Sequence, residues 1–455
     1  MNILNKKEPI ALFLGDVLFF LISLWFMLFF RYAQAPSLEK IQQHIVPFSF
    51  LFIVWALVFF IAGLYEKRAI LLKSRLPITL FNAQIANSMI AVLFFYFIPY
   101  FGITPKVSLF LYLIISFFLV LGWRIYIYPL FGSHKKEKAI LVGSGEEMEE
   151  LKNEVNTNSR YGIHFVSSIN LCDLSSFDFK EDILNRVYSD DVQVIVADLQ
   201  NDKVEPILPH LYNLIFSHIR FVDMYKIYED VFDRVPLSLL KYNWFLENIS
   251  ISPNILYDIL KRLTDVTISF VLGLISLIIY PFVYIMIKLD DGGVLFSYQT
   301  RVGQNNQNVN IVKFRTMTIA NDDGKWDLPA QAGKNENRVT RIGKFLRKTR
   351  LDEFPQLWNV LKGDISLIGP RPEFPEPVKR YTEEIPYYNV RHIIKPGLSG
   401  WAQLYHERHP HHGVDTKETK NKLSYDLYYI KNRSFILDLT IALKTIKALL
   451  SRGGV

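Results

Sequence analysis

The sequence predicts a membrane protein in four parts: an α-helical N-terminal bundle of four spans, a Rossmann-like α/β middle domain, a re-entrant helix hairpin, and a mixed α/β C-terminal domain that is mostly α-helical. Two observations support this architecture. The chain has 455 residues, which is too long for one compact domain. Long apolar runs fill its first third and recur once before its last third, and a strand-helix alternation lies between them. We place the parts at 1–133, 134–245, 255–290 and 291–455.

The composition excludes two broad classes of protein. Hydrophobic residues make up 50% and charged residues 21% of the chain, so it cannot remain disordered. A formal net charge of +7 is typical of a nucleic-acid binder, but the positions of the charged residues do not support that function. Residues 1–131 hold ten Lys or Arg against four Asp or Glu, so nearly all of the excess lies in the apolar first third and no nucleic acid is expected as a partner. The single cysteine, Cys172, allows no intramolecular disulfide.

Four stretches of the first third are long and apolar enough to cross a bilayer, which takes about 20 helical residues. The third is the weakest, because Asn82, Gln84, Asn87 and Ser88 make its first half polar. Lys and Arg concentrate between the second and third stretches and after the fourth, so both ends of the bundle should face the cytoplasm. The stretches are Ile10–Phe30, Ile45–Leu64, Ile78–Phe101 and Val107–Phe131.

A fifth apolar run, Val266–Ile287, contains no charged residue. Basic residues flank it on both sides, Lys261–Arg262 before it and Lys288 after it, and this symmetry argues against a crossing. Pro281 lacks an amide proton and clashes with the preceding turn, so it can break the helix and return the chain to the side from which it entered. We therefore expect a re-entrant hairpin. The alternative is an ordinary fifth span that tolerates its proline.

The middle segment has the pattern of a small parallel sheet of the Rossmann type. Gly143-Ser144-Gly145 forms a turn after the first strand, and a helix starts at Glu146. The dinucleotide fingerprint is incomplete, because Met148 replaces its third glycine and Asn170 replaces its acidic residue. A structural or dimerising domain is the main expectation and dinucleotide binding is the alternative. The predicted strands are Lys138–Val142, His164–Ile169, Val192–Ala197 and Arg220–Val222.

Chemistry-bearing residues gather in the last third. Alternating residues from Val294, broken at Gly303–Asn306, predict a β-hairpin that ends near Lys313 and Arg315. A basic run follows and leads directly into Asp352 and Glu353. Its members are Arg338, Arg341, Lys344, Arg347, Lys348 and Arg350.

Pro355 and Gly363 predict a short helix over residues 352–362, with Asp352 and Glu353 in its first turn. The helix dipole and the nearby cations should keep both carboxylates ionised. An ionised Asp352 is a poor general acid but a usable nucleophile or metal ligand. An isolated Asp-Glu pair at such a position usually only caps the helix, and the surrounding residues are what favour chemistry here.

Arg371 stands between Pro370 and Pro372, so its guanidinium is held rigidly and suits bidentate recognition of a phosphate. Three segments then carry a resemblance: KFRTM at 313–317, TRLDEFPQLWNVLKGDISLIGPRPE at 349–373 and KPGLSGWAQ at 395–403. They resemble the bacterial sugar transferase family, the polyprenyl-phosphate phosphoglycosyl transferases of the monotopic type. The four-part arrangement is similar to the large members, such as the undecaprenyl-phosphate galactose and glucose phosphotransferases. Departures from the family pattern are Ile365 in place of Met, Ser399 in place of Thr, and Tyr280 before Pro281 in place of Ser.

The resemblance implies an enzyme of the bacterial inner membrane whose catalytic domain lies in the cytoplasm. It would transfer a sugar 1-phosphate from a UDP-sugar to polyprenyl phosphate, release UMP and start the assembly of an exopolysaccharide, capsule or O-antigen. A homodimer is expected, and galactose and glucose are the leading sugars. Two non-transferase functions stay open: a membrane-anchored nucleotide sensor or scaffold, and a nucleotide-sugar oxidoreductase. Tyr257 and Lys261 have the spacing of a dehydrogenase pair, which we attribute to chance.

The same resemblance assigns Asp352 as the nucleophile that forms an aspartyl-phosphosugar and Glu353 as the ligand of an essential Mg²⁺. Arg371 would hold the nucleotide or sugar phosphates. Lys313, Arg315 and Arg347 would position the polyprenyl phosphate or Asp352. Four more residues are expected beside the site, and for the two acids among them a capping or salt-bridge role is equally expected. They are Arg350, Asp364, Glu373 and Lys395.

Two further features are left with alternatives. Residues Ser434–Leu450 have the apolar spacing of a helix that lies in the membrane interface or packs in the core. Histidines cluster shortly before that helix, where an exposed loop is the main expectation and a zinc site the alternative. The histidines are His406, His409, His411 and His412.

Overall fold

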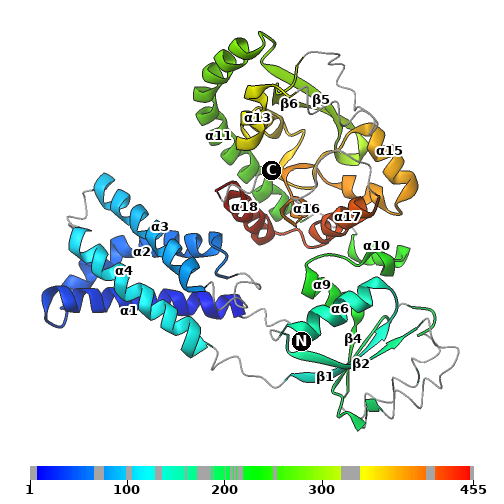
Figure 1. The fold of residues 1–455 in the computed structure, drawn as a ribbon, viewed down its shortest axis with the longest axis horizontal. Coiled ribbons are helices and arrows are strands. Elements are labelled where there is room, and N and C mark those ends of the chain that lie inside the picture. The colour runs from blue at the N-terminus through cyan, green and yellow to red at the C-terminus, as the bar shows by residue number, and fades with distance from the viewer. Residues whose placement is uncertain are drawn as a thin grey trace. The chain divides into compact units, whose positions relative to one another are not determined.

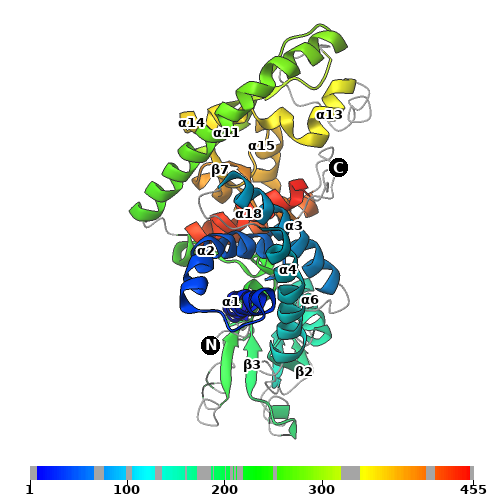
Figure 2. The same cartoon turned by 90° about the vertical axis from the view of Figure 1, so that its left-hand side faces the viewer.

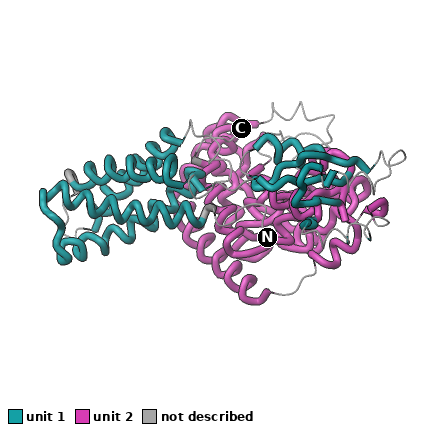
Figure 3. Tube along the Cα trace, turned by 90° about the horizontal axis from the view of Figure 1, so that it is seen from below, with its two compact units in different colours: residues 1–143, 149–197, 209–222 teal, residues 144–148, 198–208, 223–455 magenta. Residues whose placement is uncertain are grey.

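The computed structural model describes most of the chain, and its described part divides into two compact units (Figure 3). Unit 1 consists of residues 1–143, 149–197 and 209–222, and unit 2 of residues 144–148, 198–208 and 223–455. The described residues are 8–65, 76–98, 105–128, 136–158, 161–171, 186–187, 189–199, 201–204, 209, 212, 219–249, 254–318, 339–405 and 416–450.

Four long helices of unit 1 form the N-terminal bundle (Figure 1). They occupy the four predicted stretches in order, and each is apolar and long enough to cross a membrane. In unit 2, α11 contains the fifth predicted apolar run and meets the same criterion, so the described chain has five such helices. The bundle helices are α1 (Glu8–Tyr32), α2 (Leu38–Ile61), α3 (Leu76–Phe97) and α4 (Pro105–Gly122), the last continued by a π-helical turn, Trp123–Ile127.

Buried polar residues explain how the third helix tolerates its polar half. Gln84 and Asn87 are buried inside the bundle. The Nε2 of Gln84 donates to the Oγ of Ser116 at 3.3 Å, and the Nε1 of Trp55 donates to the backbone oxygen of Asn87 at 3.1 Å. The side chain of Gln84 and the backbone of Asn87 are thus bonded to neighbouring helices, whereas Asn82 is exposed.

The middle sheet has four strands in the order β2-β1-β3-β4, and β1 pairs in parallel with both β2 and β3. All four predicted strands are present, which confirms the Rossmann-like pattern. The helix α6 (Glu146–Thr157) follows β1 through the glycine turn, and Met148 is buried on it. The strands are β1 (Glu137–Gly143), β2 (Ile163–Asn170), β3 (Val194–Ala197) and β4 (Arg220–Asp223).

The rest of unit 2 is mostly helical, with two small sheets. The predicted hairpin is confirmed as the antiparallel pair β5 and β6, and β7 pairs in parallel with β8. Its elements are α9 (Met224–Phe232), α10 (Tyr242–Asn248), α11 (Ile255–Asp290), β5 (Phe296–Val302), β6 (Asn308–Phe314), α13 (Arg341–Thr349), α14 (Gln356–Lys362), β7 (Ser366–Ile368), α15 (Pro375–Glu384), β8 (Gly397–Ser399), α16 (Trp401–Tyr405), α17 (Thr416–Lys431) and α18 (Phe435–Leu450), with 3₁₀ segments at Leu237–Leu239, Gln304–Asn306, Leu351–Glu353 and Tyr388–Ile393.

The predicted break at Pro281 is corrected by the structure, because α11 is one continuous helix of 36 residues with Pro281 inside it (Figure 2). Proline removes one backbone hydrogen bond, but it does not have to reverse the chain when packing holds the helix on both sides. Val283 and Ile287 follow Pro281 and are buried against Phe314 and Leu346. This contact fixes the helix beyond the proline.

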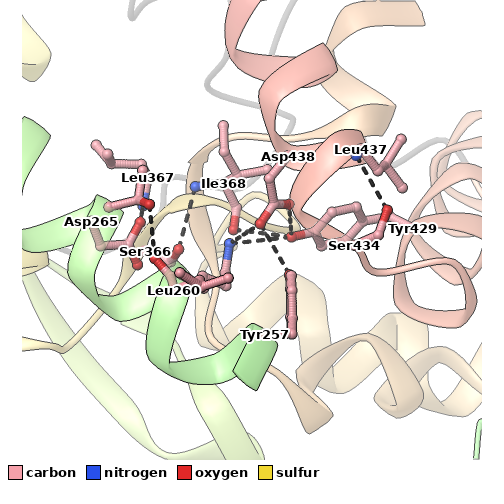
Figure 4. Close-up of polar contacts among 12 residues, drawn as sticks. Tyr257, Leu260, Asp265, Ser366, Leu367, Ile368, Tyr429, Ser434, Leu437 and Asp438 are labelled. Carbon is pink, nitrogen blue, oxygen red and sulfur yellow. Dashed lines mark hydrogen bonds and ion pairs between the residues drawn. The ribbon is translucent and has the colours of Figure 1, made fainter. Parts of the chain in front are cut away.

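Both ends of α11 nevertheless contact the same domain. Near its start, Arg262 donates to the backbone oxygens of Val360 and Leu361 at 2.7 Å each, which satisfies carbonyls at the end of α14. Asp265 accepts a hydrogen bond from the amide of Leu367 at 3.1 Å (Figure 4). At its end, Asp291 forms an ion pair with Arg315. Both ends of the helix are therefore fixed to the C-terminal domain.

A polar cluster joins the start of α11 to α17 and α18. The hydroxyl of Tyr257 and the ammonium of Lys261 bind the same oxygen of Asp438, at 3.0 and 2.9 Å. The hydroxyl of Tyr429 binds the other oxygen at 2.7 Å (Figure 4). Tyr257 and Lys261 thus have a packing role, which agrees with treating their dehydrogenase-like spacing as chance.

Candidate active site

Asp352 and Glu353 lie in a 3₁₀ turn between α13 and α14. The predicted helix over 352–362 is therefore shorter at its start, because α14 begins at Gln356 after Pro355 as its N-cap. Arg350 adopts φ 57° and ends α13, and this left-handed residue turns the chain so that the two acids follow at once. Gly363 ends α14 with φ 94°, as predicted. The acids thus precede the helix instead of forming its first turn.

Glu353 is bound by two cations from distant parts of the chain. The ammonium of Lys313, at the end of β6, lies 3.1 Å from its Oε1. A guanidinium nitrogen of Arg371, in the loop after β7, lies 3.1 Å from the same oxygen. Burial would raise the pKa of Glu353, but Lys313, Arg371 and Arg350 outweigh burial and hold that pKa well below its usual range. Glu353 therefore stays ionised throughout the physiological pH range.

Asp352 is in the opposite situation. It is 8% exposed, and its Oδ1 has no hydrogen-bond partner among the described residues. Burial raises the pKa of Asp352, and the opposing effects of Lys313, Arg347 and Arg350 do not fully offset it. The expectation that the surroundings favour the ionised form of both acids is thus wrong for the direction of the pKa shift at Asp352. An unpartnered, partly desolvated carboxylate is more reactive as a nucleophile than a fully paired one.

Arg347 and Arg350 act on Asp352 through their charge. Both lower its pKa, but neither forms an ion pair with it among the described residues. The Nε of Arg347 donates to the hydroxyl of Thr316 at 2.9 Å, which fixes the side chain at the end of α13. Gly343 allows this approach, because a Cβ there would overlap the backbone oxygen of Thr316. The structure thus places both arginines beside the site, as predicted.

Arg315, which was also expected in the site, has partners other than Asp352 and Glu353. It is 4% exposed and forms an ion pair with Asp291 at the end of α11. It also donates to the backbone oxygens of Val294 and Met317, at 2.8 and 2.9 Å. Successive residues of a strand point to opposite faces, so Lys313 and Arg315 share a face in an ideal strand. Here β6 ends at Phe314, and Arg315 instead fastens α11 to the hairpin.

Three of the four residues expected beside Asp352 and Glu353 (the dyad) have other residues as their contacts. Asp364 accepts from Asn359 at 3.1 Å at the end of α14. Glu373 pairs with Arg391 at 2.9 Å. Lys395 lies beside Gly363, again at the end of α14. A Cβ added to Gly363 would be 3.5 Å from the ammonium of Lys395. Asp364 and Glu373 thus have the structural roles that were the equal alternative.

Asn359 is a positioning residue that the sequence reasoning missed. Its amide nitrogen donates to the backbone oxygen of Asn310 at 2.8 Å, and its Oδ1 accepts from the amide of Val312 at 3.1 Å. These bonds tie α14 to β6 next to Lys313. Val360, Ile365 and Ile311 pack beside this tie. A buried asparagine on the apolar side of a short helix was the available signal.

Glu353 fits a magnesium site in which the substrate supplies the remaining ligands of the ion. Among the described residues, no group of three or more His, Cys, Asp or Glu side chains could hold a metal alone. Mg²⁺ commonly binds through one or two carboxylates plus substrate phosphates and water. Glu353 has a second carboxylate oxygen, to which neither Lys313 nor Arg371 is hydrogen-bonded. This oxygen fits the expected metal ligand, and the unpartnered Oδ1 of Asp352 is left for the expected nucleophile.

The middle domain has a surface cavity of about 540 Å³ at its glycine turn. The lining includes one lysine, Lys241, and four acids, which is an unfavourable balance for a dinucleotide pyrophosphate. The acids are Glu146, Glu147, Asp198 and Asp202. Residues 406–415, with the predicted histidine cluster, lie outside the described residues.

Comparison with known proteins places the site in a recognised family. The sequence model of the bacterial sugar transferase family matches residues 256–452. A UDP-N-acetylgalactosamine-undecaprenyl-phosphate N-acetylgalactosaminephosphotransferase of Aeromonas hydrophila is 38% identical over 262 residues, which is 57% of this chain and 59% of that protein. The uncharacterized sugar transferase EpsL of Bacillus subtilis is 38% identical over 197 residues, 43% of this chain and 90% of that protein.

A third relative shows the same partial coverage. The UDP-glucose:undecaprenyl-phosphate glucose-1-phosphate transferase of Klebsiella pneumoniae is 39% identical over 192 residues, which is 41% of this chain and 39% of that protein. The match thus spans less than two thirds of the Aeromonas and Klebsiella proteins and about nine tenths of the Bacillus protein.

Proposed function

Because this chain belongs to the bacterial sugar transferase family, we propose that its C-terminal domain transfers a sugar 1-phosphate from a UDP-sugar to polyprenyl phosphate. Relatives whose names specify this reaction use UDP-N-acetylgalactosamine or UDP-glucose with undecaprenyl phosphate. One observation carries the proposal. The buried carboxylate of Asp352 has an oxygen without a hydrogen-bond partner in the described chain, directly beside a Glu353 whose charge is offset by Lys313 and Arg371.

The reaction consists of two displacements at one phosphorus. An oxygen of Asp352 attacks the β-phosphorus of the UDP-sugar, the bond from that phosphorus to the bridging oxygen breaks, and UMP leaves. The phosphate oxygen of the lipid then attacks the same phosphorus and breaks its bond to Asp352. The carboxylate is regenerated, and the product is a polyprenyl diphosphosugar. No proton has to be transferred to Asp352 in either step, which suits a carboxylate nucleophile.

Lys313 and Arg371 give the site its positive charge. Their two charges exceed the single negative charge of Glu353, so the three groups together leave one net positive charge close to Asp352. Phosphoryl transfer depends mainly on positioning and on stabilising charge at the phosphate oxygens. Arg371 is 32% exposed in its side chain and is therefore accessible to an incoming diphosphate. We assign the nucleotide or sugar phosphates to Arg371.

Magnesium completes this proposal. When bound to Glu353, it would offset the charge of the diphosphate that the negative carboxylate of Asp352 must approach. The low pKa of Glu353 supports this assignment, because a permanently ionised carboxylate keeps a metal ligand available.

The location of the site supports a lipid substrate. Apolar side chains between the two ends of α11 are exposed, among them Phe270, Leu274, Ile278 and Phe282. Both ends of the helix contact one domain, so we propose that α11 enters the membrane from the cytoplasmic side without placing the domain on the other side. The dyad would then lie at the depth of the lipid phosphate. A homodimer and four membrane-crossing N-terminal helices stay part of the proposal.

The proposal is tested with purified full-length protein, polyprenyl phosphate, Mg²⁺ and a panel of UDP-sugars that begins with N-acetylgalactosamine, glucose and galactose. We expect UMP release with one of the UDP-sugars. Repeated turnover should require polyprenyl phosphate. Release of UDP in place of UMP would contradict the proposal, because it would show cleavage at the sugar carbon. A nucleotide sensor would bind nucleotide without releasing UMP from any donor.

A further inference from the structure

The backbone around Arg371 is held at four consecutive carbonyl oxygens. Each accepts a hydrogen bond from a different residue, and two of the four donors are arginine side chains. In chain order, Pro370 accepts from the amide of Gly397 at 2.9 Å, Arg371 from Arg391 Nη2 at 3.1 Å, Pro372 from Arg301 Nη1 at 3.3 Å, and Glu373 from the amide of Val302 at 2.8 Å.

This arrangement removes the remaining freedom of the segment. Pro370 and Pro372 have no amide proton, so neighbouring elements can hold these two residues only through their carbonyl oxygens. The proline rings already fix φ near −65°. A hydrogen bond to each carbonyl fixes the following peptide plane and hence ψ. The backbone of Arg371, and the direction in which its side chain leaves it, is thereby determined.

Arg391 is itself firmly oriented. It is 4% exposed, and its Nη1 binds the Tyr388 hydroxyl at 2.7 Å and Glu373 at 2.9 Å. Its Nη2 pairs with Asp426 at 2.8 Å and donates to the Arg371 carbonyl. These partners come from α17 and from the segments on both sides of α15. These four contacts use both terminal nitrogens of the guanidinium, which carry four N–H donors, whereas a lysine ammonium has only three.

Arg301 holds the other side of the segment from β5. Its guanidinium lies 3.5 Å from the ring centroid of Phe374 and donates to Gln299 at 2.7 Å. The same planar group donates to the Pro372 carbonyl. A guanidinium can stack on an aromatic ring and donate hydrogen bonds in its own plane at the same time, whereas an ammonium cannot.

We propose that Arg301 and Arg391 are positioning residues, which hold the backbone of Arg371 so that its guanidinium stays on Glu353 and faces the substrate phosphates. The kinetic part of this inference rests on the proposed transferase function. Neither arginine touches the reacting atoms. A displacement of Arg371 by about 1 Å would lower the rate on the order of 10²-fold.

The first test is a double-mutant cycle on kcat for UMP release. Arg301→Lys and Arg391→Lys each keep the positive charge, and we expect each to lower kcat about 10-fold or more. In an Arg371→Met background the same changes should have little further effect, because the group that they position is gone. Equal fold-losses in both backgrounds would overturn the inference. Arg380→Met on the exposed face of α15 is the matched control and should leave kcat unchanged.

The second test does not depend on activity. Hydrogen exchange of the Val302 and Gly397 amides, which donate to Glu373 and Pro370, reports directly on the segment. We expect faster exchange at one or both amides in the two lysine variants and no change in Arg380→Met. Unchanged exchange in both lysine variants would overturn the inference. An Asp352→Asn variant with full activity would instead refute the transferase mechanism and leave the exchange result standing.

Discussion

Asp352 and Glu353 are neighbours in the chain, yet their carboxyl groups are shifted in opposite directions. Burial raises the pKa of Asp352, which keeps an oxygen without a partner among the described residues. Two cations bound to one oxygen hold the pKa of Glu353 low. Opposite shifts in adjacent acids separate their chemical roles. One suits a nucleophile, and the other a permanently charged ligand.

The pH dependence of activity should report Asp352. Its raised pKa means that the nucleophile becomes protonated at a higher pH than an ordinary aspartate, so kcat/KM should fall as the pH drops and recover as it rises. The inflection should lie above about 4, the ordinary value for aspartate. Glu353 should add no inflection there, because its pKa is held low. The measurement is a pH profile of UMP release.

Arg347→Met is the variant that checks this assignment. Arg347 lowers the pKa of Asp352, so its loss should move the inflection to higher pH and reduce the rate more at pH 6 than at pH 8. A uniform loss across the pH range would show that the inflection belongs to another group.

Lys313→Met should lower kcat about 10²-fold, the usual cost of losing one group that stabilises charge in the transition state. Lys313 is held by Glu353 at 3.1 Å, so the variant also leaves Glu353 with Arg371 as its one ion-pair partner in the described chain. Steady-state kinetics on the purified variant measures the effect. Lys379→Met, on the exposed side of α15, is the control. A rate within twofold of the original protein would remove Lys313 from the site.

Arg315→Met should affect stability and not chemistry. The buried guanidinium fastens Asp291 and two backbone oxygens, and its loss should cost about 2–3 kcal/mol of unfolding free energy. Thermal unfolding in detergent measures the loss. The rate per folded molecule should stay near that of the original protein at a temperature where the variant is folded. A selective loss of kcat with an unchanged melting temperature would return Arg315 to the active site.

Glu353→Gln should weaken metal binding. The amide is neutral and a poorer Mg²⁺ ligand than a carboxylate, so more Mg²⁺ should be needed to reach half of the maximal rate. A titration of activity with Mg²⁺ after treatment with a chelator gives this value for both proteins. Full activity of the original protein in excess chelator would refute the metal assignment.

The sequence predicted the architecture well, because the spacing of apolar residues and the positions of glycine and proline reflect local physics. Four apolar helices, four strands of the middle sheet and the β5–β6 hairpin all lie where the pattern placed them. Pro281 shows the limit of local reasoning. A proline disfavours a helix interior by about 3 kcal/mol, but the burial of Val283 and Ile287 beyond it is a tertiary effect that the sequence pattern does not display.

The same limit applied to the site. Lys313, Arg347 and Arg371 lie near the dyad as predicted, because the positively charged residues of the motifs converge on these two acids. The ion pair of Arg315 with Asp291 was not predicted, because Asp291 is far from the motif in sequence. The raised pKa of Asp352 was missed for a related reason. Charge can be counted along a chain, whereas burial depends on the packing around the 3₁₀ turn.

The most direct test of the covalent mechanism is mass spectrometry of protein quenched after mixing with the preferred UDP-sugar and Mg²⁺ but without lipid. We predict a mass increase of one phosphosugar on the peptide that contains Asp352. In Asp352→Asn the adduct and UMP release should both disappear, and its melting temperature should not fall, since a neutral amide is easier to bury than a charged carboxylate. Glu376→Gln, an exposed acid on α15, should keep both signals. Lipid-linked product formed by Asp352→Asn at the original rate would contradict the mechanism.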